Sequence, residues 1–199
     1  MAGSTDPMTF LTDFADQAVV LPVVLAVALV LTAQGWRRGA VVWLGVVGAT
    51  LGVVLLLKLG FMACEPVFGP WSLRTPSGHT AAASVVAGGF ATVLGGGTLV
   101  TLAVAVLAAA AIGTSRVELG HHSLPEVLIG AVTGIAGAAI LVRLAGRPPL
   151  PRPVPLLAVA VVVAVLVHGF HLPAETAISH FARGMLNFLP ACRERVGTL

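Results

Sequence analysis

Two short stretches of this chain hold most of the residue types that could do chemistry. The first begins at Lys58 and runs through Pro76–Ser77–Gly78–His79, and the second lies between Ser115 and Glu126. The second stretch contains an arginine, two adjacent histidines and two carboxylates, which are Arg116, His121, His122, Glu118 and Glu126. Cations, histidines and a carboxylate that meet at one end of a helical bundle are typical of an anion site with acid–base groups.

The run Pro76–His79 is placed to open a helix, and a helix N-terminus presents unpaired N–H groups that bind phosphate. Gly78 would let the backbone approach an anion closely because glycine has no Cβ. Lys58 and Arg116 would add full positive charge for the phosphate oxygens. We therefore expect a phosphate to be bound by these two cations together with the backbone of Ser77 and Gly78.

His122 and Glu126 are four residues apart, so they share one face if a helix begins early enough. A carboxylate behind an imidazole fixes its tautomer and raises its basicity, which leaves the other ring nitrogen to attack. A second histidine, His79, can donate a proton to a leaving alkoxide. These are the parts for phosphoryl transfer through a phosphohistidine, and nothing in the set requires a metal or another cofactor.

These stretches resemble the type 2 phosphatidic acid phosphatase (PAP2) superfamily, which includes membrane lipid phosphatases and soluble vanadium haloperoxidases. The family pattern is K-x6-R-P, then P-S-G-H, then S-R-x5-H-x3-D. Here the three motifs read Lys58-x6-Glu65-Pro66, Pro76–His79 and Ser115-Arg116-x5-His122-x3-Glu126. The resemblance covers residues 58–126, with the motifs in the family's order and each at an expected helix end.

The resemblance implies a role for each matching residue. His122 would be the nucleophile, Glu126 would take the place of the aspartate that orients it, and His79 would protonate the leaving group. Lys58, Arg116 and the backbone of Ser77 and Gly78 would hold the phosphate.

Two positions depart from the family pattern. Glu126 keeps the negative charge of the family's aspartate but adds a methylene. Glu65 replaces a phosphate-binding arginine with an anion, which should weaken phosphate binding unless the side chain turns away or pairs with Arg74. One hypothesis is that Arg74 supplies the missing cation, and another is that Glu65 contacts a substrate hydroxyl or amine.

Several of these residues also have simpler interpretations. Lys58 could be an anchor that extends from a helix end to the membrane surface. Ser123 and Glu126 have the spacing of a capping box, so Glu126 could cap a helix as well as orient His122. His121 fits a loop residue. The spacing of His168, His171 and His180 is irregular and predicts no metal site.

The composition points to a membrane protein. Of 199 residues, 57% are hydrophobic and only 10% are charged, which excludes a disordered tail, a coiled coil and an ordinary soluble domain. The net charge of +3 and the scattered arginines give no indication of nucleic-acid binding. We expect an all-α polytopic helix bundle with a PAP2-like core.

The charge-free runs predict six transmembrane helices between residues 8 and 171. They are expected near Gln17–Trp36, Gly39–Leu57, His79–Leu94, Thr98–Ser115, Pro125–Leu144 and Val154–Phe170. Glycines in the later helices, such as Gly130 and Gly134, are expected to permit close helix packing. Residues 1–7 look like a cloning remnant, and residues 172–199 predict an amphipathic tail.

The arginines predict the orientation of this bundle. The turns opposite the two reactive stretches hold Arg37, Arg38, Arg147 and Arg152, with Arg143 close by. Positive residues favour the cytoplasmic side, so the site would face the periplasm or cell exterior from a bacterial inner membrane. The arginines of the C-terminal tail do not fit this bias.

We therefore predict a lipid phosphatase whose partners are the bilayer and a lipid phosphate monoester or diphosphate. The alternatives are a lipid phosphotransferase with the same intermediate, and a catalytically impaired protein that binds phosphate or lipid. The identity of the lipid, the oligomeric state and any pairing of Cys64 with Cys192 stay open.

Overall fold

A computed structural model describes residues 6–63, 75–148, 152–172 and 174–185, and the described residues form eight helices and no strand. The helices are α1 (Pro7–Asp13), α2 (Gln17–Ala33), α3 (Arg37–Ala63), α4 (Gly78–Val93), α5 (Thr98–Glu118), α6 (Leu124–Ala145), α7 (Pro153–Val167) and α8 (Ala174–Met185). The all-α expectation is confirmed for this part of the chain. Cys64, Glu65, Arg74 and Cys192, to which earlier hypotheses refer, lie outside the described residues.

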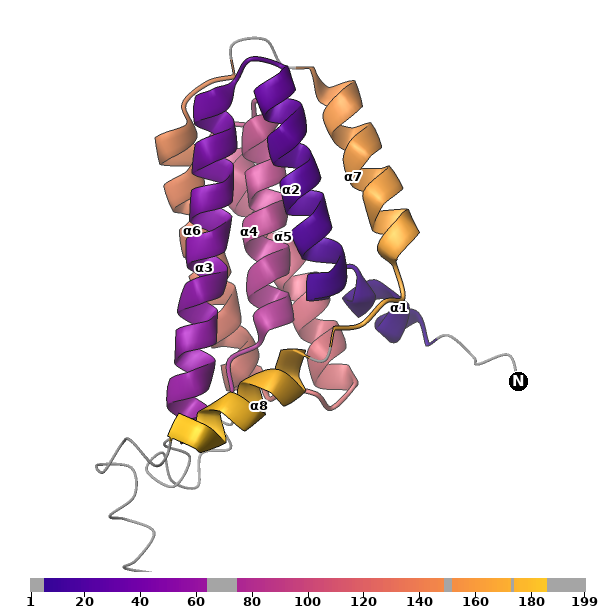
Figure 1. Cartoon of the computed structure of the whole chain (residues 1–199), viewed down its shortest axis with the longest axis vertical. Coiled ribbons are helices and arrows are strands. Elements are labelled where there is room, and N and C mark those ends of the chain that lie inside the picture. The colour runs from indigo at the N-terminus through magenta and orange to yellow at the C-terminus, as the bar shows by residue number, and fades with distance from the viewer. Residues whose placement is uncertain (1–5, 64–74, 149–151, 173, 186–199) are drawn as a thin grey trace, which may run out of the picture.

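Helix α4 lies at the centre of the bundle, in contact with α2, α3, α5 and α6 (Figure 1). Its residues suit that position because they are mostly small, and the hydroxyl side chains of Thr80 and Ser84 are fully buried. Ser84 Oγ donates to the Thr80 carbonyl at 2.7 Å, so its burial leaves no polar group unsatisfied. Trp43 and Leu141 belong to the apolar core around this helix.

Two glycines of α6 let that helix approach α4 closely. A Cβ built on Gly130 would collide with the carbonyl oxygen of Ser77, and one on Gly134 would lie 2.6 Å from the Cβ of Ser84. Any larger residue at these positions would push the helices apart. The expected role of Gly130 and Gly134 in close packing is confirmed, and their contact brings the start of α4 against the start of α6.

Six of these helices correspond to the six expected spans, but their lengths do not establish six crossings. Helices α3, α5 and α6 are long and apolar enough to cross a membrane, and α1 with α2 would make a fourth span bent by 41°. Helix α7 is apolar but shorter. Central helix α4 has 16 residues, or about 24 Å at the α-helical rise, against about 30 Å of hydrocarbon. These apolar helices indicate a membrane protein.

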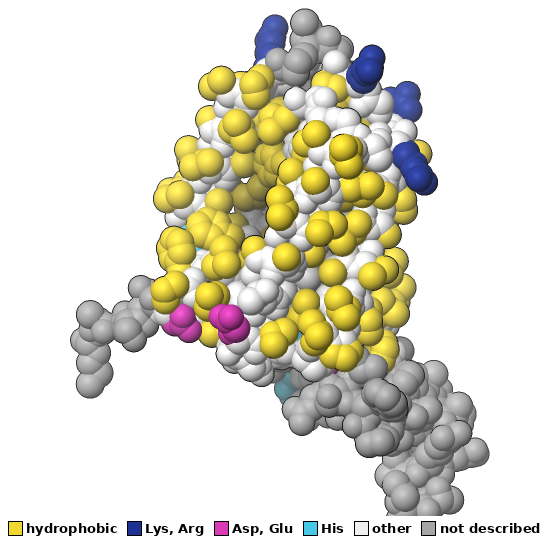
Figure 2. Space-filling model, turned by 180° about the vertical axis from the view of Figure 1, so that it is seen from behind, with side chains coloured by type: hydrophobic (Ala, Val, Ile, Leu, Met, Phe, Trp, Pro, Cys, Tyr) yellow, Lys and Arg dark blue, Asp and Glu magenta, His cyan; other side chains and the backbone are white. Residues whose placement is uncertain are grey.

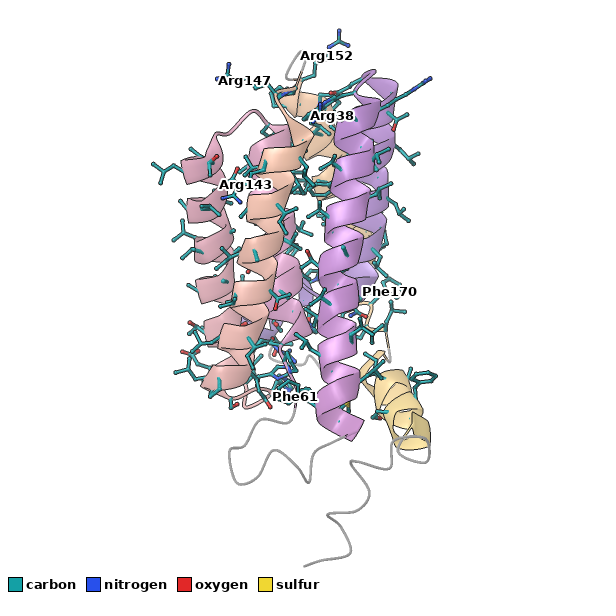
Figure 3. The ribbon with its side chains drawn as sticks, turned by 90° about the vertical axis from the view of Figure 1, so that its left-hand side faces the viewer. Arg38, Phe61, Arg143, Arg147, Arg152 and Phe170 are labelled. Carbon is teal, nitrogen blue, oxygen red and sulfur yellow. The ribbon has the colours of Figure 1, made fainter. Side chains whose placement is uncertain are left out.

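The arginines near the turns lie toward one end of the bundle (Figure 3), and the acidic side chains seen in Figure 2 lie near the other. Arg38, Arg143, Arg147 and Arg152 lie toward one end, and Phe61 lies at the other (Figure 3). Figure 2 shows the same separation from behind, with basic side chains at the top and acidic ones near the bottom. Arg38 Nη2 also donates to the carbonyl of Leu144 at 3.0 Å, which caps the end of α6.

The ends of the chain add elements that the apolar runs did not predict. Helix α1 begins at Pro7, and Asp6 caps it by accepting a hydrogen bond from the backbone N–H of Met8 at 3.1 Å. Two of the residues set aside as a cloning remnant therefore start a helix. Helix α8, within the predicted amphipathic tail, crosses the bundle at the end away from the arginines and contacts α3 (Figure 1).

Candidate active site

The motif residues that the structure describes meet at the end of the bundle opposite the labelled arginines (Figure 3). Lys58 comes from α3, Ser77 to His79 come from the start of α4, and Arg116 comes from the last turn of α5. His122 and Glu126 come from the α5–α6 connection and the first turn of α6. The fold thus joins residues from four helices.

Glu126 connects the second motif to the third. Its Oε1 accepts a hydrogen bond from the backbone N–H of Thr75 at 2.9 Å, and its Oε2 accepts one from the N–H of Ser123 at 3.0 Å. Its backbone carbonyl accepts a third from the N–H of Ser77 at 3.0 Å. One buried residue therefore fixes the segment before α4 relative to the start of α6.

His122 lies against the same carboxylate. Its Nδ1 is 3.0 Å from Glu126 Oε2, and the two side chains are only 7% and 5% exposed. The carboxylate accepts from Nδ1–H, so the lone pair of the neutral ring is on Nε2. Glu126 consequently caps α6 through Ser123 and orients His122 at the same time, as the sequence allowed.

The surroundings of His122 keep its ring neutral. Burial lowers the pKa of His122 below its ordinary value, and the positive charges of Lys58 and Arg116 lower it further. The hydrogen bond and charge of Glu126 act in the opposite direction without cancelling these effects. A neutral ring held in one tautomer is the form that a nitrogen nucleophile requires.

Lys58 lies inside α3 rather than at its end, which corrects the expected helix boundary. The helix continues to Ala63 and Lys58 is only 3% exposed, so it is not an anchor at the membrane surface. Its Nζ is 3.8 Å from the position that a Cβ on Gly78 would occupy. The ammonium group therefore lies beside the N-terminus of α4, where the phosphate is expected.

A helix-ending turn places Arg116 next to the histidines. The N–H groups of His121 and His122 both donate to the Arg116 carbonyl, at 3.0 and 3.2 Å, and the N–H of Gly120 donates to Val117. Gly120 has φ +68°, which glycine adopts without strain. This is a Schellman motif, and it folds His122 back over the end of α5. His121 is an exposed loop residue, as expected.

Ser77 and His79 begin α4. Ser77 is fully buried and caps the helix, accepting hydrogen bonds from the hydroxyl of Thr80 at 2.9 Å and from its N–H at 3.4 Å. His79 lies one residue inside the helix, and its Nε2 is 3.7 Å from Oδ2 of Asp16. The sequence had not associated Asp16 with the site. An aspartate just before a long apolar run is a signal for a helix cap, and that signal does not point to a catalytic site.

A pocket of about 350 Å³ opens beside the expected phosphate position. Lys58 and Gly78 line it, and the rest of its wall comes from α2, α3 and α8. Apart from Gln17, those walls are formed by apolar residues and glycine, which are Leu21, Leu51, Gly52, Val54, Leu55, Ala177 and Ile178. A polar corner with an apolar wall suits an amphiphilic ligand better than a small polar one.

Comparison with known proteins relates part of this chain to one family. Residues 61–148 match the family model described as the PAP2 superfamily, so the match contains the second and third motifs. A Klebsiella pneumoniae protein described as "Uncharacterized 22.5 kDa protein in cps region" is 29% identical over 181 residues, which cover 85% of this chain and 87% of that protein. No solved structure matches the chain. Residues 61–148 of this chain are therefore similar to the PAP2 superfamily.

Proposed function

We propose that this protein is a membrane phosphatase that removes phosphate from a lipid monophosphate or diphosphate through a phosphohistidine intermediate. The observation that carries the proposal is the buried His122–Glu126 pair, with 3.0 Å between Nδ1 and Oε2. The pair directs the lone pair of Nε2 away from the carboxylate, and burial with the charges of Lys58 and Arg116 keeps the ring neutral. The similarity of residues 61–148 to the PAP2 superfamily supports phosphatase-type chemistry for such a site.

The proposed reaction has two steps that both use His79. In the first, His122 Nε2 forms a bond to phosphorus, the bond from phosphorus to the leaving oxygen breaks, and His79 gives that oxygen a proton. In the second, His79 takes a proton from water, the water oxygen attacks phosphorus, and the bond to His122 breaks. Inorganic phosphate leaves, and both histidines return to their starting states.

Lys58, Arg116 and the N-terminus of α4 would stabilise the negative charge that the transferring phosphoryl group carries through both steps. The α4 N-terminus contributes backbone N–H groups, and the two side chains contribute full charges. Arg74 would add a third cation in place of the arginine that Glu65 replaces. This set of groups requires no metal ion.

The apolar pocket supports a lipid as the substrate. A headgroup phosphate beside Lys58 and Gly78 would leave an attached hydrocarbon chain next to the walls from α2, α3 and α8. Burial of that chain contributes about 0.8 kcal/mol for each CH₂ group removed from water. The pocket therefore favours long-chain phosphates over soluble phosphate esters.

We propose that the arginine end of the bundle faces the cytoplasm of a bacterial cell, with the site on the opposite side of the inner membrane. A reporter active only in the periplasm, fused after residue 199, would be active if this topology holds. A fusion active only in the cytoplasm would reverse it.

The test of the function is phosphate release from a panel of lipid phosphates in detergent, with and without EDTA. His122→Ala should abolish release, while His121→Ala, which removes an adjacent exposed histidine, should retain most of it. When the reaction with radiolabelled lipid phosphate is stopped without acid, the wild-type protein should carry labelled phosphate. The His122→Ala protein should carry none. Full turnover by His122→Ala would refute the mechanism, and loss of release with EDTA would refute its metal independence.

The same panel separates the two alternatives. Added lipid alcohol that becomes phosphorylated would identify a phosphotransferase. Binding of vanadate or phosphate with no turnover of any lipid phosphate would identify a protein that binds phosphate without catalysis. Arg74→Ala should lower activity and phosphate affinity. If neither changes, the hypothesis that Arg74 supplies the cation missing at Glu65 is wrong.

A further inference from the structure

The turn between α1 and α2 brings a buried carboxylate to the expected leaving-group side of the site. Asp16 is only 7% exposed, and its two oxygens have different contacts. Oδ1 accepts a hydrogen bond from the N–H of Ala18 at 2.8 Å, which caps α2. Oδ2 lies 3.7 Å from Nε2 of His79. Capping uses one oxygen, and the second faces the histidine.

The backbone around Asp16 is held on both sides. The N–H groups of Val19 and Val20 donate to the Asp16 carbonyl at 3.0 and 2.8 Å, and the N–H of Asp16 donates to the carbonyl of Asp13 at 3.1 Å. The carboxylate of Asp13 is in turn 3.0 Å from Nε2 of His171, in the segment between α7 and α8. Asp16 is thus fixed in a turn that is itself attached to a second part of the chain.

The contact differs from the His122–Glu126 pair in a way that suits a different role. At 3.0 Å, Glu126 accepts a hydrogen bond and fixes the tautomer of a nucleophile. At 3.7 Å, Asp16 is beyond hydrogen-bond distance and acts on His79 through its charge. An acid must hold a proton and then release it to the substrate, and a carboxylate that bonded it tightly would compete for that proton.

We propose that Asp16 is a positioning residue for His79: its carboxylate faces the ring and stabilises the positive charge that His79 carries while it holds the proton for the leaving oxygen. When the bond from phosphorus to that oxygen breaks, the proton passes to the oxygen and His79 becomes neutral. When water attacks the phosphohistidine, His79 takes up a proton and the charge beside Asp16 is restored. This inference rests on the proposed function, and it assigns each of the two histidines its own carboxylate.

The test compares leaving groups, because proton donation matters for a poor leaving group and little for a good one. The substrates are a long-chain alkyl phosphate, which leaves as an alkoxide unless protonated, and nitrophenyl phosphate, which leaves readily. Asp16→Asn removes the charge and keeps the cap, since asparagine caps helices as well as aspartate does. It should lower kcat for the alkyl phosphate by about tenfold or more and leave nitrophenyl phosphate nearly unchanged.

Asp13→Asn is the matched control, because it removes a carboxylate from the same segment that pairs with His171 and not with His79. Asp13→Asn should not lower kcat for the alkyl phosphate more than it lowers kcat for nitrophenyl phosphate. Asp16→Ser provides a second variant with a capping oxygen and no charge, for use if the Asp16→Asn protein does not fold. The double variant Asp16→Asn with His79→Ala should lose no more activity on the alkyl phosphate than His79→Ala alone.

An equal loss on both substrates, or no loss on either, would overturn the role of Asp16. A further loss in the double variant would do the same, because it would mean that Asp16 acts without His79. Failure of the proposed function itself is recognised separately, since His122→Ala would then retain turnover on both substrates.

Discussion

Replacing Glu126 with glutamine is the sharpest perturbation that the site offers. The side chain keeps its length and loses one hydrogen-bond acceptor. In the native site Oε1 accepts from the N–H of Thr75, while Oε2 accepts from the N–H of Ser123 and from Nδ1 of His122. All three partners donate toward the carboxylate, but an amide has only one oxygen and presents N–H donors at its other end.

Neither orientation of the glutamine amide satisfies the three donors. If the NH₂ group faces Thr75, two donors meet and a buried N–H is left unsatisfied, which costs about 1–3 kcal/mol of unfolding free energy. If it faces His122, the ring must accept at Nδ1 and carry its proton on Nε2, which removes the nucleophile's lone pair. Holding a catalytic histidine in the wrong tautomer lowers kcat by on the order of 10⁴-fold.

The assay measures lipid phosphate release and thermal unfolding in the same detergent. Glu126→Gln should lower kcat by about 10³-fold or more while the protein still folds, with unfolding free energy reduced by about 1–3 kcal/mol. Glu126→Asp restores the family's residue and the charge but is one methylene shorter, so it should lose part of the hydrogen bonding and keep more activity than glutamine. Glu126→Gln with wild-type turnover would refute the assignment of His122 and Glu126.

Three further predictions follow from the same packing and charges. The acidic limb of the kcat/KM profile should lie below pH 6.5, the ordinary pKa of histidine, because the pKa of His122 is lowered by burial and by Lys58 and Arg116; a limb above that value would contradict it. Lys58→Met should weaken vanadate inhibition and move the acidic limb to higher pH, because it removes a charge that lowers the pKa of His122. Lys58→Arg keeps the charge and should move the limb less. An unmoved limb in Lys58→Met would count against the proximity of Lys58 and His122. Gly130→Ala should cost about 1–3 kcal/mol of stability and reduce turnover, because the new Cβ would meet the Ser77 carbonyl. Gly45→Ala should do neither, because a Cβ there has nothing within 4 Å. Equal unfolding temperatures for the two variants would refute the close packing at Gly130.

The helices could be predicted because each depends on a local pattern. Long apolar runs ended by charges or glycines located α2 to α7 to within a few residues, apart from the end of α3. That end was placed at Lys58 because a buried lysine within a span is costly, and local hydropathy does not reveal the partners that make it tolerable. Helix α1 was missed because its seven residues are too few for a periodic apolar pattern.

Most of the described site could also be predicted, since motif spacing relates residues that are close in the chain. His122 and Glu126 meet because they are four residues apart at the start of a helix, and Ser77 caps α4 because it directly precedes it. Asp16 and His79 meet only because α2 and α4 pack together, and no local pattern relates them. The same holds for Thr75, whose N–H donates to Glu126 although the two residues are 51 positions apart in the chain.

The sequence alone predicted the membrane character, the helices, the separation of basic turns from the two motif stretches, and the residue types of the expected phosphate site. These properties follow from composition and short-range spacing, which act through hydropathy, helix periodicity and charge. The packing of the helices was needed to show that Lys58 is buried beside Gly78, that the N–H of Thr75 donates to Glu126, and that Asp16 lies beside His79. Those contacts join segments far apart in the chain, and they depend on how closely the glycine-lined faces of α4 and α6 and the turn before α2 come together.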